Sequence, residues 1–218
     1  MKRILCFGDS NTWGYDYDSY TPETGVQQRY AFDERWPGIV QDLLGSSYTV
    51  IEDALNSRTV VATDPVLPHR LGLDSLEADL EIHTPLDLVV IQLGANEFKT
   101  MYNRSAGAIA FGMDAMVRAC LTPRYGYPTP QVLLIAPAPI HPQTSQMALG
   151  FHYAEGAYEK SLAIAEEYRA VAARRGIGFL DAGALDFELN TVDGVHYSKR
   201  DHHRLAHAVA DKIHDMIG

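Results

Sequence analysis

Three side chains that lie far apart in the sequence have the types needed for nucleophilic chemistry, namely Ser10, Asp193 and His196. A serine hydroxyl is a poor nucleophile until a base removes its proton, and histidine is well suited to be that base. Asp193 precedes His196 by three residues, so its carboxylate can accept one imidazole N–H while the other ring nitrogen faces the serine. The set therefore suggests a Ser-His-Asp triad.

Each of these residues also has a purely structural interpretation. Ser10 follows an apolar run in the stretch FGDSN, where it could simply cap the N-terminus of a helix. Asp193 precedes a glycine, and Asp-Gly is a common turn dipeptide. A turn at this point would still bring Asp193 close to His196, so the structural and catalytic interpretations are compatible for that pair.

Acyl transfer also needs hydrogen-bond donors for the negative charge that develops on the carbonyl oxygen. The candidate donors are the backbone N–H of Ser10, a backbone N–H at Ser57 and the side-chain amide of Asn96. Asn96 has an alternative interpretation as part of an Asx-turn in its loop. The candidate substrate contacts beside the serine are Asp9, Asn11 and Trp13, although Asp9 is also suited to accept hydrogen bonds within the turn.

Apolar runs that do not alternate with polar residues predict strands covered on both faces. Helical stripes of apolar residues lie between these runs, and this alternation predicts a parallel sheet with helices on both sides. We expect one α/β domain over residues 1–218, a three-layer sandwich of flavodoxin type with five strands. The predicted strands are 4–7, 48–51, 86–93, 132–136 and 177–180, and the predicted helices cover 36–44, 73–82, 109–120, 158–172 and 205–216.

The site should lie beyond the carboxyl ends of these strands, where open α/β sheets bind their ligands. The segments that follow the strands carry the candidate residues, which should therefore meet at one rim. Two long loops, 14–32 and 137–150, are candidate binding loops. Ser198 and Asp201 have the spacing of a capping box, which predicts that the last helix begins just after His196.

Composition limits the remaining possibilities. The 218 residues are 46% apolar and 21% charged, with a formal net charge of −10, which is typical of a soluble protein and argues against nucleic acid or anionic membrane partners. Cys6 and Cys120 lie in apolar segments and are expected to be free buried thiols. The first apolar run is too short for a signal peptide and no run could span a membrane, so we expect a cytoplasmic protein.

Two histidines near the end of the chain, His203 and His207, have a spacing that can place both on one face of a helix as metal ligands. No carboxylate or cysteine nearby completes a plausible ligand set. We therefore expect an exposed helix face at these positions, with no metal and no other cofactor.

Four blocks of the sequence resemble those of the GDSL/SGNH hydrolases. The blocks are FGDSNTWG, ALNSRTV, LGANEFK and DGVHYS, and their order and spacing fit the family over nearly the whole chain. The resemblance implies the SGNH hydrolase fold, a nucleophile at Ser10, oxyanion donors at Ser10, Ser57 and Asn96, and the acid and base at Asp193 and His196.

The segments RWPGIVQDLL, HTPLDLVVIQLG and FLDAGAL make the similarity greatest to the arylesterase and acyltransferase branch of this family. That similarity implies a serine esterase of short, acetyl-type carboxylic esters, with possible acyl transfer to alcohols, no cofactor and a homo-oligomeric assembly. Alternatives are a carbohydrate acetyl esterase, a thioesterase or lysophospholipase with a long acyl pocket, and a non-catalytic module that binds a small ligand.

The sequence departs from the family pattern at several positions. The second block is usually written GLNGRT, and here Ala54 and Ser57 replace its glycines. The backbone N–H survives a change from glycine to serine if the local φ and ψ angles tolerate a side chain. Ala95 and Glu97 replace the usual threonine and aspartate of the third block, which puts the hydrogen bonds around Asn96 in question.

Overall fold

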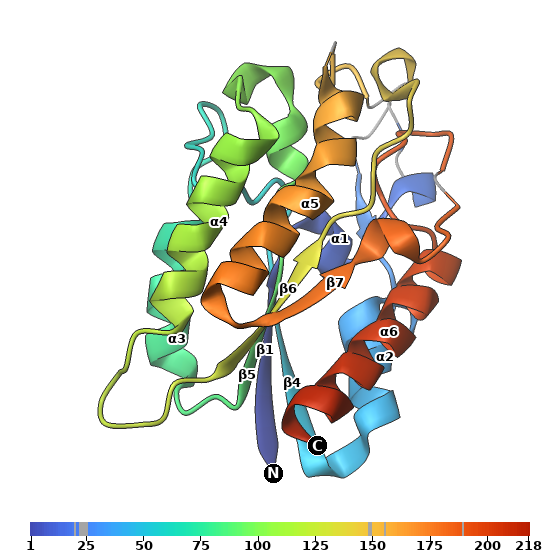
Figure 1. Ribbon diagram of the computed structural model, residues 1–218. Coiled ribbons are helices and arrows are strands. Elements are labelled where there is room, and N and C mark those ends of the chain that lie inside the picture. Colours follow the sequence, from blue (N-terminus) through green and yellow to red (C-terminus); the bar gives the residue numbers. More distant parts are fainter. Residues whose placement is uncertain (20, 22–25, 148–149, 155, 189) are drawn as a thin grey trace.

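A five-stranded parallel sheet forms the centre of the protein (Figure 1), as seen in a computed structural model that describes residues 1–19, 21, 26–147, 150–154, 156–188 and 190–218. The strand order is β4-β1-β5-β6-β7, which confirms the flavodoxin-type prediction. The strands are β1 (Lys2–Gly8), β4 (Tyr48–Ala54), β5 (Leu88–Gln92), β6 (Gln131–Ala136) and β7 (Gly178–Asp181).

Helices cover both faces of the sheet and complete the three layers (Figure 1). The side chains of β1 explain why its sequence does not alternate with polar residues. Leu5 and Phe7 pack into the apolar cluster on one face, whereas Ile4 and Cys6 pack into the cluster on the other. The first face carries α3 (Gly72–His83), α4 (Ala106–Cys120) and α5 (Ala157–Arg175), and the second carries α2 (Trp36–Leu44) and α6 (Lys199–Ile217).

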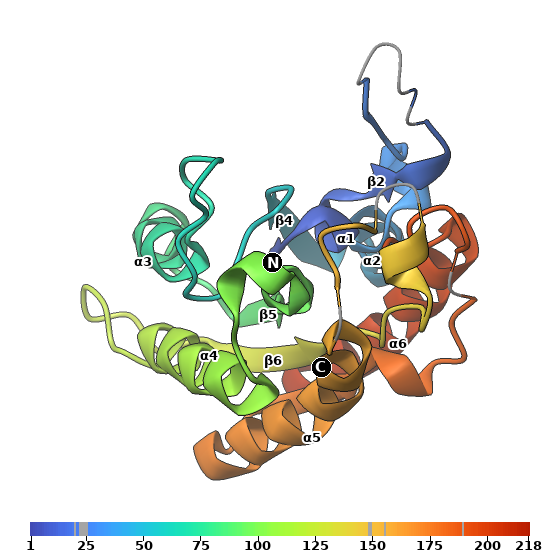
Figure 2. The same ribbon diagram turned by 90° about the horizontal axis from the view of Figure 1, so that it is seen from above.

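The order in which the strands are added reverses at β1. The chain places β4 on one side of β1, and then returns to place β5 on the other side. Gly8, the last residue of β1, lies opposite Ala54 of β4 and Gln92 of β5. The segments that follow these three strands therefore leave the sheet side by side. Figure 2, seen from this side, shows the short helix α1 (Ser10–Trp13) flanked by the loops that follow β4 and β5.

The long loop predicted over 14–32 contains regular structure within its described part. β2 (Tyr15–Asp16) and β3 (Gln28–Arg29) pair as a two-stranded antiparallel sheet. The other long loop, 137–150, contains a 3₁₀ turn at Thr144–Gln146. Residues 20, 22–25 and 148–149 of these two loops lie outside the described residues.

Helix α6 begins with the capping box that the sequence predicts. The Ser198 hydroxyl accepts from the N–H of Asp201 at 3.2 Å, and the Asp201 carboxylate accepts from the N–H of Ser198 at the same distance. The Asp201 carboxylate also accepts from the N–H of Glu188 at 3.0 Å. The capping box thus joins the start of the helix to the loop that contains His196.

Both cysteines are free and buried, as predicted. Burial raises the pKa of Cys6, and burial raises that of Cys120 to about 12. None of the helices among the described residues combines the length and the hydropathy that crossing a bilayer requires.

Candidate active site

The three residues singled out for nucleophilic chemistry meet at the carboxyl ends of the strands. Nδ1 of His196 lies 2.7 Å from Oδ2 of Asp193, and Nε2 lies 2.8 Å from Oγ of Ser10. Because the carboxylate can only accept, Nδ1 carries the proton and Nε2 is left to accept the serine O–H. The imidazole is therefore in the tautomer that can remove the proton of Ser10.

The loop that carries Asp193 and His196 is organised by Asn190, which the sequence alone did not single out. The Asn190 side-chain nitrogen donates to Oδ1 of Asp193 at 2.9 Å and to the carbonyl of His196 at 2.7 Å. Its oxygen accepts from the N–H groups of Val192, Asp193 and Gly194. One amide side chain thereby fixes the separation of Asp193 and His196 within the loop.

Asp193 is ionised in this environment although only 1% of its surface is exposed. Burial by itself raises the pKa of a carboxyl group, but the charge of His196 and the hydrogen bonds from His196 and Asn190 outweigh that effect. The net result is a pKa of Asp193 well below its ordinary value. A carboxylate held in this way orients the imidazole and stabilises it when it becomes charged.

Ser10 is the first residue of α1, and the residue that caps this helix is Asp9. The Asp9 carboxylate accepts from the N–H of Asn11 at 3.0 Å, so the interpretation of Ser10 as the helix cap is wrong. Burial raises the pKa of Asp9 to about 6. The serine hydroxyl is consequently free of a capping role and turns toward His196.

The two other candidate oxyanion donors lie in loops that are bonded to each other. Ser57 has a φ of 64°, the left-handed conformation that glycine adopts most easily, and its N–H donates to no group of the described chain. The Asn96 side chain donates one N–H to the carbonyl of Arg58 at 3.0 Å, which leaves its second N–H available. The bond to Arg58 joins the loop of Asn96 to the loop of Ser57.

Arg58 and Glu97 hold the loop of Ser57 in place. The Arg58 guanidinium donates to the carbonyl of Gly8 at 3.2 Å and to Oδ1 of Asp53 at 2.8 Å, so it joins the loop to the end of β1. The Glu97 carboxyl group accepts from the N–H of Val60, and from that of Val61 at 3.3 Å. The glutamate that replaces the usual aspartate thus has a defined structural partner.

Two further residues lie at this site, Tyr15 of the candidate binding loop 14–32 and Gln92 at the end of β5. The Tyr15 ring packs on the His196 imidazole with 4.1 Å between centroids. Gln92 accepts from the hydroxyl of Thr12 at 2.8 Å and donates to the hydroxyl of Tyr197 at 3.1 Å. The contacts of both residues are with groups that are distant in the sequence. The sequence signal for Gln92 is an apolar run that ends in a glutamine.

The three predicted substrate contacts surround Ser10 in different ways. Asp9 is the helix cap described above, and Asn11 is buried with both polar atoms of its side chain bonded to the backbone around His196. Trp13 is half-buried, and the guanidinium of Arg29 lies over its ring at 5.2 Å. Substrate contact by these residues stays a prediction.

His203 and His207 lie on α6 with their rings 4.6 Å apart. Among the residues that the structure describes, no group of three histidine, cysteine, aspartate or glutamate side chains is arranged to hold a metal ion.

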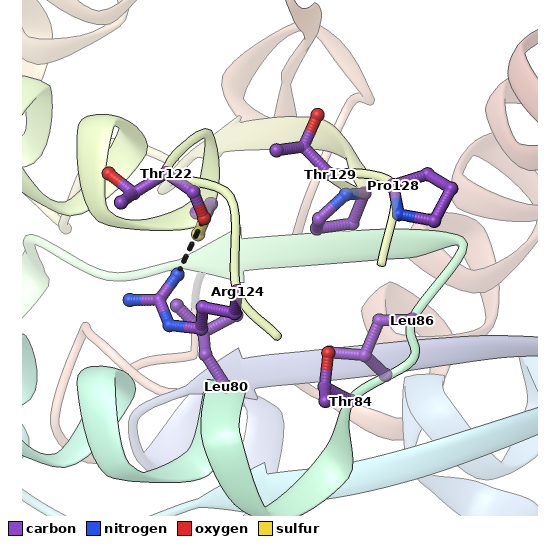
Figure 3. Close-up of a pocket in the computed structure, with 9 residues that line it drawn as sticks. Leu80, Thr84, Leu86, Thr122, Arg124, Pro128 and Thr129 are labelled. Atoms are coloured by element: carbon purple, nitrogen blue, oxygen red, sulfur yellow. Dashed lines mark hydrogen bonds between the residues drawn. The ribbon is translucent and has the colours of Figure 1, made fainter. Parts of the chain in front are cut away.

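A separate pocket lies at the opposite end of the sheet (Figure 3), between the ends of α3 and α4 and the start of β5. It has a volume of about 260 Å³, part of which is open to solvent, and the Arg124 side chain donates to the carbonyl of Thr122 at its edge. Its residues have no contact with the serine or the histidine described above. The lining residues are Leu80, Thr84, Leu86, Cys120, Thr122, Arg124, Pro128, Thr129 and Pro130.

A doubly wound parallel sheet with a serine, an imidazole and a carboxylate in a hydrogen-bonded row at its switch point has the architecture of a serine hydrolase. Residues 6–213 match the model of the GDSL-like lipase/acylhydrolase family. The chain belongs to this family and is a serine esterase.

Solved structures support this assignment. The chain is 36% identical to Est24, a carbohydrate acetylesterase from Sinorhizobium meliloti, with 99% of each chain covered and a TM-score of 0.90. It is 35% identical to the aryl esterase of M. smegmatis, over 99% of this chain and 100% of that one, with a TM-score of 0.88. No curated protein matches the chain.

Proposed function

We propose that Ser10, His196 and Asp193 are the catalytic triad of this esterase, and that its substrates are short-chain, acetyl-type carboxylic esters. The observation that carries the proposal is the continuous hydrogen-bonded row from Asp193 through His196 to Ser10, with distances of 2.7 and 2.8 Å. These distances lie within the range in which a general base can take a proton directly.

The reaction begins when Nε2 of His196 removes the proton of Ser10 and Oγ forms a bond to the ester carbonyl carbon. The electron pair of the C=O bond moves to the oxygen, which accepts hydrogen bonds from the N–H groups of Ser10 and Ser57 and from the Asn96 amide. The tetrahedral intermediate then breaks its bond to the alcohol oxygen, and His196 gives its proton to the departing alcohol. Water repeats the sequence on the acyl-enzyme and releases the acid.

The alcohol part of the ester is proposed to be an aryl or a carbohydrate group. The M. smegmatis relative is an aryl esterase and Est24 is a carbohydrate acetylesterase, and the two have nearly equal identity to this chain. Turnover of aryl acetates measured against acetylated xylo-oligosaccharides separates the two classes. A series from acetate to decanoate tests the short acyl preference, and faster turnover of decanoate would indicate a lysophospholipase or thioesterase instead.

Replacement of the nucleophile or the base is the direct test of the triad. Ser10→Ala and His196→Ala are each expected to lower kcat for p-nitrophenyl acetate by about 10³–10⁶-fold, because the remaining groups supply only part of the rate enhancement. His203→Ala, which changes an exposed histidine of α6, is the matched control and should keep full turnover. Near-full activity of Ser10→Ala would exclude the proposed nucleophile.

We also propose that the acyl-enzyme can pass its acyl group to an alcohol, and that the protein is a homo-oligomer. A dry, narrow channel that admits alcohols better than water would favour transfer, and assembly of several chains could build one. Measuring ester product and free acid together, at increasing concentrations of an added alcohol, tests transfer. Size-exclusion chromatography with light scattering tests assembly, and a monomer would remove this basis for transfer.

A further inference from the structure

The residue that follows Ser10 is bonded to both neighbours of His196. The side-chain nitrogen of Asn11 donates to the carbonyl of Val195 at 3.3 Å, and its oxygen accepts from the N–H of Tyr197 at 3.0 Å. Only 3% of the Asn11 surface is exposed. One buried amide therefore forms two hydrogen bonds between segments that are 184 and 186 residues apart in the sequence.

The turn that carries Ser10 and the loop that carries His196 are each held internally. Neither set of internal bonds determines the distance between Ser10 and His196, so a link between the two segments is required. Asn190 fixes Asp193 and His196 relative to each other, within one loop. Asp9 fixes the turn that carries Ser10. The bond between Ser10 and His196 is itself consumed during proton transfer, so it cannot hold the two segments together throughout the reaction.

The side chain of Gln92 also connects α1 to the loop that carries His196. Gln92, at the end of β5, accepts from Thr12 of α1 at 2.8 Å and from the indole N–H of Trp36 at 3.0 Å. Its own N–H donates to the hydroxyl of Tyr197 at 3.1 Å. The residue after Asn11 and the residue after His196 are thus bonded to the same amide, which holds α1 and the loop at a fixed height above the sheet.

We propose that Asn11 is a positioning residue for the esterase reaction, which sets the separation of Ser10 Oγ and His196 Nε2 through the backbone on both sides of His196. Both polar atoms of its side chain are bonded to the backbone, so Asn11 acts through the chain on either side of His196. The inference rests on the proposed function, since it gives Asn11 a role only if Ser10 and His196 react. A displacement of about 1 Å between reacting groups can lower the rate by roughly 10²-fold.

The test compares Asn11→Leu, which has a similar size and no polar atoms, with Asn11→Asp, which keeps the acceptor for Tyr197 and loses the donor for Val195. With p-nitrophenyl acetate, Asn11→Leu is expected to lower kcat about 10²-fold with KM changed by less than about threefold. Asn11→Asp should lie between this variant and the wild type. The rate of Ser10 labelling by a fluorophosphonate should fall in the same order.

Gln41→Leu is the matched control, because Gln41 forms the same kind of link at the other end of the molecule. Its side chain donates to the carbonyl groups of Gly45 and Tyr48 and accepts from the N–H of Val50 at 2.8 Å. Gln41→Leu should lower the free energy of unfolding and leave kcat unchanged. A loss of kcat in Asn11→Leu that merely equals the loss in Gln41→Leu would overturn the positioning role.

The remaining outcomes separate this inference from the proposed function. Labelling and turnover that require Ser10 in the wild type, together with an unchanged kcat in Asn11→Leu, would reject the inference and keep the triad. A raised KM with unchanged kcat would also reject it and indicate substrate contact by Asn11. If Asn11→Leu does not fold, Asn11→Asp decides, and wild-type kcat and labelling in that variant would reject the role. Turnover that persists in Ser10→Ala would reject the proposed function itself.

Discussion

Ser57 combines a backbone N–H that is proposed to bind the oxyanion with a side chain that is unfavourable in this conformation. Its φ of 64° belongs to the left-handed region, where a residue other than glycine costs about 1–2 kcal/mol. The contacts of Asn96 with Arg58 and of Glu97 with Val60 and Val61 hold the surrounding loop and maintain this conformation. The proposed reaction uses only the N–H of Ser57, so the reaction itself does not require the serine side chain.

Ser57→Gly and Ser57→Val test this separation of backbone and side chain. Because glycine accepts the left-handed conformation, Ser57→Gly should keep the free energy of unfolding or raise it by up to about 1 kcal/mol, with kcat within about threefold of the wild type. Ser57→Val should lower the unfolding free energy by about 1–3 kcal/mol. Urea unfolding and p-nitrophenyl acetate kinetics measure both effects. A large loss of kcat in Ser57→Gly would mean that the hydroxyl takes part.

Glu97 is completely buried beside the same loop, and burial raises its pKa to about 8, although hydrogen bonds from the N–H groups of Val60 and Val61 lower it in part. The fold therefore favours the protonated form. Because the pKa of Glu97 is higher in the folded state than the ordinary value of 4.5, the protonated carboxyl group contributes to the free energy of unfolding. This contribution is complete below about pH 4.5 and is lost as the pH rises through 8.

Glu97→Gln should remove this dependence on pH, because the amide oxygen can still accept from Val60 and Val61 and cannot ionise. The free energy of unfolding of Glu97→Gln minus that of the wild type is expected to increase by roughly 1–3 kcal/mol between pH 6 and pH 9. Urea titrations at each pH measure the difference, and Glu77→Gln at an exposed position of α3 is the control. A difference that does not change with pH would contradict the assignment.

At the scale of the elements, the strands and the long helices were predictable because each has a long apolar pattern. The runs at 4–7 and 132–136 became β1 and β6, and both faces of each are covered. β2 and β3 were not predicted, because strands of two residues have no measurable periodicity.

The candidate site shows the same limit. That Ser10, Asp193 and His196 meet could be predicted, because their types and spacing indicate a reaction. The supporting roles of Asn190 and Gln92 could not be found, because a buried amide is recognised only by the groups that three-dimensional folding brings to it.

The serines that cap α4 and α6 allow the effect of losing a helix cap to be compared at two helices. Ser105 caps α4 and Ser198 caps α6, and each hydroxyl accepts an N–H at 3.2 Å. Ser105→Ala and Ser198→Ala should each lower the free energy of unfolding by about 1 kcal/mol. Only Ser198→Ala should also lower kcat, by several-fold, because α6 begins three residues after His196. Equal kcat values in the two variants would show that the start of α6 does not affect the base.

At the scale of the whole molecule, the two thiols lie in the apolar clusters on opposite faces of the sheet. Cys6 lies in β1 and packs toward α2 and α6, whereas Cys120 ends α4 on the other face of the sheet. Both are completely buried, and their raised pKa values keep them as unreactive thiols.

Neither thiol should react with Ellman's reagent in the native protein, and both should react in denaturant without added reductant. The second-order labelling rate should follow the unfolded fraction in urea, since both thiols are completely buried in the folded chain. Rapid labelling under native conditions would show that one face opens locally. Fewer than two reactive thiols in denaturant would indicate a disulfide.

The separation of 186 positions between Ser10 and His196 also determines when in the life of the protein the proposed chemistry can begin. A ribosome that adds about 5–20 residues per second needs roughly 10–40 s to travel from the codon for one to the codon for the other. During that interval the nascent chain already carries Ser10, the proposed nucleophile, but it lacks His196, the proposed base. Under the proposed mechanism an unfinished chain therefore cannot acylate itself on an ester, and hydrolysis starts only when synthesis has reached the last helix.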